Sequence, residues 1–321
     1  MRHVLMLAAM VSATVLAAGC LETKQDATLN PDGSGKARVE IVMSDMPFQM
    51  TPDQEPPPPD MVAKQFAKSV LDGSKGVDAW ADVSCQRTED NRNRFSGTAY
   101  FKDFTKMELQ GGQNEGMTFT SDGKGGVILK MAPPKKDDQK PQDAPPPQLT
   151  EEQIQQRIQA ERMKWQQMKP MMTLFLGKMK MEVTFRLPGP LTQVKGFQKT
   201  DDGGVRFGFD GEKVLAVLDK FMADDAFVRA QVLKGGGDPG QPPLDDPAVV
   251  KELFGVEGAL EAHAGPPVSP QFDYNAEVQA AKAAYPGMIK KLGLDQLPQA
   301  QPMMPPGFGF PGGMEGGPGM P

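Results

Sequence analysis

The feature that most constrains how this chain can fold is an Asp-Gly turn that recurs between runs of alternating apolar and polar residues. Three such units span 28–42, 117–131 and 192–209. Asp-Gly supplies the positive φ angles that a tight turn between antiparallel strands requires. Each unit therefore predicts a β-hairpin. Their irregular spacing argues against a solenoid of repeats.

Other segments show helical periodicity or further strands. We expect a helix from Met61 to about Leu71 capped by Asp60, and a short helix over Asp103–Leu109. The sequence also predicts strands at Ala79–Thr88 and Phe95–Phe101, and a strand that continues from Leu191 to Gln198. Near the end, Asp273 or Asn275 starts a helix that Pro286 is expected to break.

The longest predicted helix follows Thr150, which is a suitable N-cap before Glu151 and Glu152. Pro170 is expected to kink or split this helix. An apolar stripe follows one of its faces, which favours core packing, with membrane insertion as the alternative. The stripe consists of Ile154, Ile158, Trp165, Met168, Met172 and Phe175.

Together these patterns predict an α+β fold: a mostly antiparallel, twisted sheet of hairpins packed against helices, with the other face partly wet. We expect one α+β domain over 20–234, with Pro-rich linkers at 51–59 and 132–149. A mainly helical part over 235–295 is expected to pack on the same body. The Pro- and Gly-rich residues 296–321 are predicted to be a disordered tail.

The first nineteen residues have the pattern of a secretory signal peptide. Arg2 opens the segment, Val4–Leu16 carries no charge, and small residues follow. This apolar stretch is too short to cross ~30 Å of hydrocarbon as a permanent helix.

Leu16-Ala17-Ala18-Gly19-Cys20 resembles a bacterial lipobox, although Leu is commoner at the position of Ala17. The resemblance implies cleavage between Gly19 and Cys20, a diacylglycerol on the Cys20 thiol and an acyl chain, such as palmitate, on its new amine. It also implies an extracytoplasmic lipid anchor. Because Leu21 stands where Asp would signal inner-membrane retention, it implies an outer membrane facing the periplasm in a cell with two membranes. The alternative is an ordinary signal peptide before a structural cysteine.

Charge restricts the partners. Without residues 1–19, 34 basic residues face 41 acidic ones, because Arg2 is the only charged residue removed. An acidic chain argues against nucleic acid as a partner and against a broad basic face on anionic lipid.

The residues favour a non-enzymatic protein with no catalytic residues and no cofactor. His263 is the only histidine after residue 19, so every Ser/His or Cys/His arrangement would have to use it. Its alternating segment predicts a structural residue at an edge or facing solvent. Cys85 lies in a strand pattern and is expected to fill the core. A hydrolase is the least favoured class.

Methionine is abundant, with 22 residues in the chain. Thioethers are soft ligands, so a copper-binding envelope lipoprotein is the alternative function. Methionine also fills irregular cores, and these residues lie on the predicted apolar faces of a helix and a strand. The copper hypothesis would use Met168, Met171, Met172, Met179 and Met181.

Three short segments resemble a motif of LppM-like bacterial lipoproteins. They are Val183–Pro190, which ends in Pro-Gly-Pro, then Val194-Lys195-Gly196, then Val205-Arg206-Phe207. The strand, Asp32-Gly33-Ser34-Gly35 turn and strand after Cys20 fit the same pattern. The resemblance implies an α+β envelope domain that binds lipids or protein partners, without catalytic residues. We therefore expect a lipid-anchored envelope protein, attached to the membrane through its N-terminus, that binds a lipid or an envelope protein.

Overall fold

The computed structural model describes residues 21–44, 58–109, 112–113, 116–132, 149–233, 246–256 and 258–297. The predicted signal peptide, Cys20 and residues 298–321 of the predicted tail lie outside these ranges. So do 51–57 and 133–148, which make up most of the two predicted linkers.

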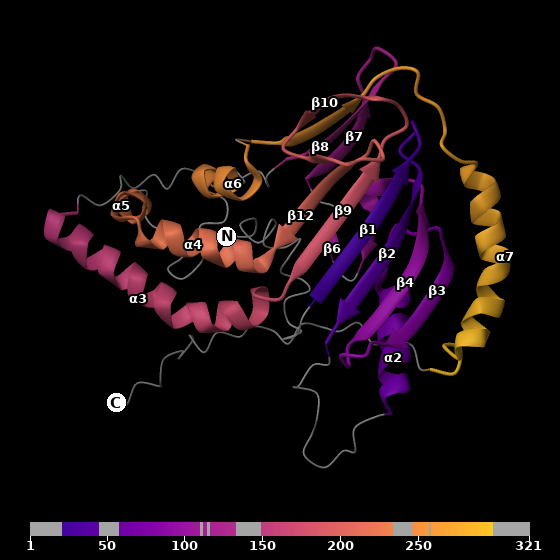
Figure 1. Ribbon diagram of the computed structural model, residues 1–321, viewed down its shortest axis with the longest axis horizontal. Coiled ribbons are helices and arrows are strands. Elements are labelled where there is room, and N and C mark those ends of the chain that lie inside the picture. Colours follow the sequence, from indigo (N-terminus) through magenta and orange to yellow (C-terminus); the bar gives the residue numbers. More distant parts are fainter. Residues whose placement is uncertain are drawn as a thin grey trace, which may run out of the picture.

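The largest element is a seven-stranded sheet in which every neighbouring pair is antiparallel except β1 and β9 (Figure 1). β1 is a central strand, paired with β2 on one side and with β9 on the other. In spatial order the strands are β11 (Gln198–Lys199), β12 (Val205–Asp210), β9 (Lys180–Arg186), β1 (Leu21–Leu29), β2 (Gly35–Met43), β4 (Asn93–Phe101) and β3 (Ala79–Arg87).

A second, antiparallel sheet of four strands lies at one end of the first (Figure 1). Its order is β10 (Leu191–Lys195), β13 (Leu260–Ala264), β8 (Val127–Met131) and β7 (Met117–Ser121). Two short strands, β5 (Glu108–Leu109) and β6 (Gly112–Gln113), form a further pair.

The helices fall into three groups. α2 packs on β3 and β4, α7 packs along the edge strand β3, and α3 to α6 form a separate layer beside β12 in which α4 contacts α3, α5 and α6. Their bounds are α2 (Pro59–Gly73), the 3₁₀ helix η1 (Phe104–Lys106), α3 (Glu151–Leu176), α4 (Gly211–Ala223), α5 (Asp225–Leu233), α6 (Pro247–Phe254) and α7 (Tyr274–Leu292).

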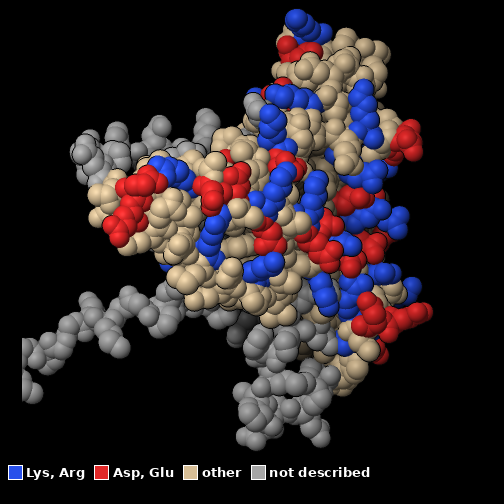
Figure 2. Space-filling view, turned by 60° about the vertical axis from the view of Figure 1, so that its left-hand side comes forward, with Lys and Arg blue, Asp and Glu red and all other residues tan. Residues whose placement is uncertain are grey.

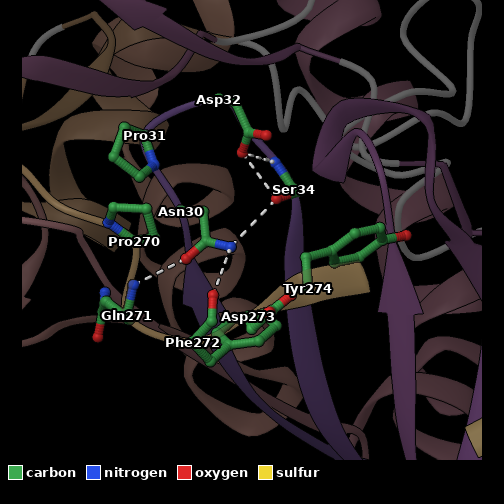
Figure 3. Close-up of a pocket in the computed structure, with 9 residues that line it drawn as sticks. All are labelled: Asn30, Pro31, Asp32, Ser34, Pro270, Gln271, Phe272, Asp273 and Tyr274. Carbon is green, nitrogen blue, oxygen red and sulfur yellow. Dashed lines mark hydrogen bonds between the residues drawn. The ribbon is translucent and has the colours of Figure 1, made fainter. Parts of the chain in front are cut away.

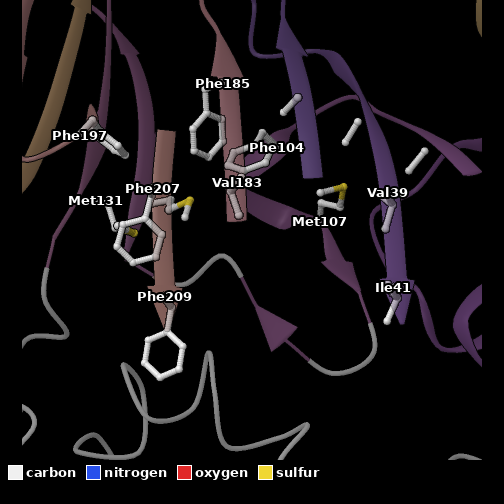
Figure 4. Close-up of a cluster of buried hydrophobic side chains, with 14 of the residues drawn as sticks. Val39, Ile41, Phe104, Met107, Met131, Val183, Phe185, Phe197, Phe207 and Phe209 are labelled. Carbon is white, nitrogen blue, oxygen red and sulfur yellow. The ribbon is translucent and has the colours of Figure 1, made fainter. Parts of the chain in front are cut away.

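One continuous core lies between the inner face of the large sheet, the small sheet and the helices (Figure 4). Phe104 from η1 is 1 % exposed and stands edge-on to Phe185 of β9, with ring centroids 5.1 Å apart. Such edge-to-face pairs add to the stabilisation from burial. Phe104 of η1 thus fills the core against the inner face of the sheet.

The opposite face of the large sheet is polar. Glu182 of β9 lies 3.8 Å from Lys24 of β1 and 3.2 Å from Arg206 of β12, and Glu40 pairs with Arg94 at 3.2 Å. Figure 2 shows Lys and Arg interleaved with Asp and Glu on the side of the molecule that it presents. Exposed ion pairs of this kind contribute little to stability, and their main effect is to keep this face hydrated.

The structure confirms the predicted α+β class, and it confirms the first two hairpins with antiparallel registers. The third was only partly right, because β10 pairs with β13 in the small sheet and only Gln198–Lys199 pairs with β12. The predicted continuous strand 191–198 was therefore wrong. The chain turns at Gly196, where φ is +77°, and buries Phe197 before entering the large sheet.

Three local predictions were also wrong. Asp60 lies in the first turn of α2, and the N-cap position is Pro58. Asp103 caps only the single turn of η1, after which the chain extends as β5. Pro286 does not break its helix, because α7 continues to Leu292, and α3 likewise is not split at Pro170. Packing on both sides of each proline explains this, since tertiary contacts outweigh local propensity.

Residues after 235 contribute a strand to the small sheet and a helix that covers an edge of the large sheet. β13 lies between β8 and β10 in the small sheet, and α7 covers β3. An edge strand exposes unpaired N–H and C=O groups, so α7 also protects the large sheet from pairing with another chain. The amide of Val83, at a bulge in β3, lies 3.2 Å from the sulfur of Met288 on α7.

Candidate functional site

An open pocket of about 800 Å³ lies where the β1–β2 turn meets the segment that leads into α7 (Figure 3). Its wall consists of Asn30, Pro31, Asp32 and Ser34 from the turn, and residues 270–274 from the segment. The two walls are about 240 residues apart in sequence. The pocket therefore exists only because the fold brings these segments together.

Asn30 joins the two walls. Its side-chain oxygen accepts a hydrogen bond from the Gln271 amide at 2.8 Å, and its nitrogen faces the Ser34 hydroxyl at 3.2 Å and the Phe272 carbonyl at 3.5 Å. Figure 3 shows these bonds converging on one side chain. Asn30 is only 4 % exposed, so its polar groups need these partners.

The two carboxylates of the pocket have local structural partners. Asp32 accepts hydrogen bonds from the Ser34 amide at 3.0 Å and from its hydroxyl at 2.7 Å. Asp273 is the N-cap of α7 and accepts from the Ala276 amide at 3.0 Å. Asp32 and Ser34 thus act as turn-forming residues, as the sequence predicted.

Two tyrosines beside the pocket are held in their protonated form. Burial and a 2.5 Å hydrogen bond to Asp78 raise the pKa of the Tyr274 phenol. Burial and a 3.0 Å bond to Glu277 raise the pKa of Tyr100 to about 12. Both are therefore hydrogen-bond donors at neutral pH, and neither is suited to act as a general base.

A cation and an aromatic ring lie next to each other beside the pocket. Lys36 lies 2.8 Å from Glu277 and 4.3 Å from the centre of the Phe272 ring. The pocket thus offers a turn, an aromatic ring and ordered polar groups. Chemically it can recognise a polar or aromatic ligand. Its serine is hydrogen-bonded to the Asp32 carboxylate and the Asn30 amide, and no histidine is among the residues that line the pocket.

His263 lies on β13, in the small sheet, with 26 % of its side chain exposed. Its Nε2 atom is 3.6 Å from Glu261, beyond hydrogen-bond distance, and Glu261 pairs with Lys130 at 2.8 Å. Lys130 lowers the pKa of the Glu261 carboxyl. Cys85 lies on β3, at the far edge of the other sheet, so these two residues do not form a Cys/His pair.

Cys85 is half-buried, and burial raises the pKa of its thiol. A raised pKa lowers the thiolate fraction at neutral pH, which is the opposite of what a nucleophilic cysteine needs. The thiol packs against the main core, as the sequence predicted.

The five methionines of the copper hypothesis occupy different environments. Met179 is buried, while Met171 on α3 is 45 % exposed. Met168, Met172 and Met181 are half-buried against the core. Among the described residues no group of three or more His, Cys, Asp or Glu could hold a metal ion, which leaves a thioether site as an untested prediction.

The predicted lipidation site, Cys20, and the cleavage position after Gly19 lie outside the described residues. Leu21 is the first residue of β1, so the proposed anchor would directly precede a central strand. In the described ranges, no helix combines the length and apolar character needed to span a bilayer.

The sequence did not identify the 270–274 wall of the pocket, apart from Asp273 as a helix cap. A weak signal was present in Phe272 and Tyr274, two aromatic residues that flank a capping Asp. Sequence alone could not place them beside a turn near the N-terminus.

Comparisons with known proteins give one structural neighbour. No family model matches the chain, and the search of curated proteins found no match. The NMR structure of the folded domain of the LppM protein from Mycobacterium tuberculosis aligns with a TM-score of 0.29 and 12 % identity. The alignment covers 78 % of this chain and 94 % of that domain. A likeness this weak carries no argument about fold or function.

Proposed function

We propose that this protein is a non-enzymatic component of the cell envelope, held at a membrane by lipid on Cys20, that binds a partner through its sheet-and-helix body. The observation that carries the proposal is the junction of two features. A lipobox-like sequence ends at Cys20, and the central strand β1 begins at the next residue.

This junction leaves no tether between anchor and body. Two or three acyl chains give stable membrane attachment where a single chain does not. The folded body would therefore lie against the bilayer. Leu21 in place of Asp favours the outer membrane, facing the periplasm, in a cell that has two membranes.

The pocket supports a binding role on the side away from the membrane. β1 has nine residues and spans ~30 Å from the anchor to the β1–β2 turn. The pocket opens beside that turn, where a lipid still in the bilayer could not reach it. We infer that it takes a protein segment or another soluble ligand, using Phe272 and the ordered polar groups around it.

The state of the polar groups supports a non-enzymatic protein. In the described part of the chain the pocket carboxylates form turns and caps, its tyrosine, Tyr274, stays protonated, and His263 is remote from Cys85. A hydrolase would need a nucleophile beside a base.

Intact-mass spectrometry of the protein extracted from its own membrane tests the anchor. We expect a covalent gain equal to a diacylglycerol and an acyl chain on a mature chain beginning at Cys20, and loss of this gain in Cys20→Ala. An unmodified N-terminus in the parent protein would refute the anchor.

Site-specific photo-crosslinking in cells tests the pocket. A photoreactive residue at Asp32, in the exposed turn of the pocket, should give a defined adduct. The same residue at Asp201, in the exposed turn between β11 and β12, is the matched control. Equal adducts at both positions, or none at Asp32, would contradict the pocket as the binding site.

A further inference from the structure

α3 has apolar side chains on two opposite faces. On the inner face Ile154, Ile158 and Trp165 are buried against the neighbouring helices and the core. On the outer face Met163 is 58 % exposed, and Leu174 is 62 % exposed. An exposed large apolar side chain is ordinary when single, but here several follow one helix face.

The outer face is also free of charge over about five turns. At helical spacing it presents the uncharged residues Gln156, Ala160, Met163, Gln167, Met171 and Leu174, in a chain that is 24 % charged. Exposed charged residues stand at both ends of this face: Glu152, one turn before Gln156, Arg157 near its start, and Lys178 just past the end of α3. Arg157 and Lys178 make no ion pair with another described residue. A helix face that is uncharged and carries exposed apolar side chains can lie in the interface of a bilayer.

The end of α3 lies next to the start of β1. The Met179 amide donates to the carbonyl of Leu176, the last residue of α3, at 2.8 Å. β9 then runs parallel to β1 with Lys180 opposite Glu22, so the first residue of β9 lies about one strand spacing (~4.8 Å) from the second residue of β1. Lipid on the residue before Leu21 would therefore enter a bilayer near the C-terminal end of α3, where Leu174 is exposed.

The remaining exposed apolar residue on this side supports the same orientation. Figure 1 shows the underside of α3, the lower ends of β1 and β2, and α2 along one side of the molecule. Met61, in the first turn of α2, is 42 % exposed. Four of the five large apolar side chains that are exposed among the described residues, Met61, Met163, Met171 and Leu174, thus lie on elements of this side.

We propose that the outer face of α3 lies on the membrane that holds the anchor, with Met163, Met171 and Leu174 at the boundary between headgroups and acyl chains. This inference rests on the proposed lipid anchor and deepens it. The uncharged face of α3, from Gln156 to Leu174, would contact the surface over ~27 Å. A single point of attachment becomes a line of contact, which fixes the orientation of the body.

Fluorescence depth measurements on the full-length protein test this contact. In a Cys85→Ser background, Leu174→Cys and Met163→Cys are labelled with an environment-sensitive dye. Leu233→Cys is the matched control, because Leu233 is 48 % exposed at the end of α5, away from this side. The proteins are reconstituted into vesicles of phosphatidylethanolamine and phosphatidylglycerol that carry a nitroxide high on the acyl chain. Intact mass is recorded on each sample.

The expected result is a blue shift and quenching by the nitroxide lipid at 174 and 163, with neither at 233. If an acylated chain shows no quenching at 174 and 163, the membrane contact is refuted and the anchor stands. A blue shift that is already present in detergent, and that nitroxide lipid does not quench in the vesicles, would show that protein, such as a second copy, covers this face. That result would also refute the contact. An unacylated chain would refute the anchor and this placement together.

Discussion

Asn30→Ala should loosen the pocket by separating its two walls. The substitution removes a 2.8 Å bond to the Gln271 amide and a 3.2 Å bond to Ser34, together with a weak 3.5 Å contact to the Phe272 carbonyl. Each good hydrogen bond between neutral groups contributes about 1 kcal/mol net, and a polar group left without a partner costs ~1 kcal/mol or more. We therefore expect the free energy of unfolding to fall by about 2–3 kcal/mol, measured by urea denaturation.

Hydrogen exchange gives a more specific measurement of the same change. The Gln271 amide donates to Asn30 Oδ1, so its protection reports this one bond. A local loss of ~2 kcal/mol corresponds to a roughly 30-fold faster exchange, because 1.4 kcal/mol is a factor of ten. The amides of Asn93 to Phe95, at the end of β4 far from the turn, should change no more than the global stability does.

Ser34→Ala is the matched control for this reasoning. It removes the hydroxyl that faces Asn30 and Asp32 but leaves the bond from Asn30 to Gln271. It should cost about 1 kcal/mol and leave Gln271 protected. A loss below ~0.5 kcal/mol in Asn30→Ala, or an unchanged Gln271 exchange rate, would show that the side-chain amide of Gln271, bonded to the Leu29 and Arg186 carbonyls, holds the segment instead.

Three further predictions concern packing, alkaline pH and helix capping. Gly211→Ala should lower the free energy of unfolding in urea by about 3 kcal/mol or more, because the added Cβ would lie 1.7 Å from the Leu176 carbonyl oxygen. In the control Gly208→Ala the nearest atom to the added Cβ is 3.8 Å away, so the loss should be under ~1 kcal/mol. An equal loss of stability in both variants would contradict this reasoning. Burial and Glu277 raise the pKa of Tyr100 to about 12, so the neutral phenol stabilises the fold below pH 10, and this contribution should be lost as pH rises from 10 to about 12. Tyr100→Phe should flatten the fall of unfolding free energy in that window, and an unchanged pH profile would contradict this. Thr150→Ala removes the capping box with Gln153 at the start of α3 and should cost about 1 kcal/mol, which circular dichroism during urea unfolding would measure.

The sequence predicted the elements whose signals are local. Asp-Gly turns between alternating strands identified the hairpins of β1 with β2 and of β7 with β8, and Thr150 identified the start of α3. In each case, one turn or cap determines the geometry of the residues on both sides. The inward stripe of α3 likewise placed Ile154, Ile158 and Trp165 in the core.

The errors occurred where distant contacts determine the local structure. Gly196 has φ +77° and lies against Val256 and Leu260, and this close packing turns the chain from one sheet into the other. No pattern in 191–198 contains that information. Pro170 remains within α3 although it interrupts the hydrogen-bond pattern, because Met168 before it and Met172 after it both pack against the core. The pocket was missed for the same reason, since Asn30 and Gln271 are far apart in sequence.

The two faces of α3 differ in how readily a sequence pattern identifies them. A periodic pattern identifies one apolar stripe easily, and Trp165 with two isoleucines dominates it. The opposite face combines Met163 and Leu174 with glutamines, so its distinguishing property is the absence of charge rather than high hydrophobicity. Only the structure shows that this face is left exposed and that it ends beside β1.

β1 connects the two proposed regions and determines their separation. Its first residue would adjoin the lipid anchor and the end of α3, and its last residue precedes Asn30 in the pocket. A strand is nearly inextensible, so nine residues keep the pocket ~30 Å from the anchored end. If α3 also lies on the bilayer, the body cannot rotate freely about the acyl chains. The pocket would then face away from the membrane at a fixed height, where a soluble partner could bind it without approaching the lipid.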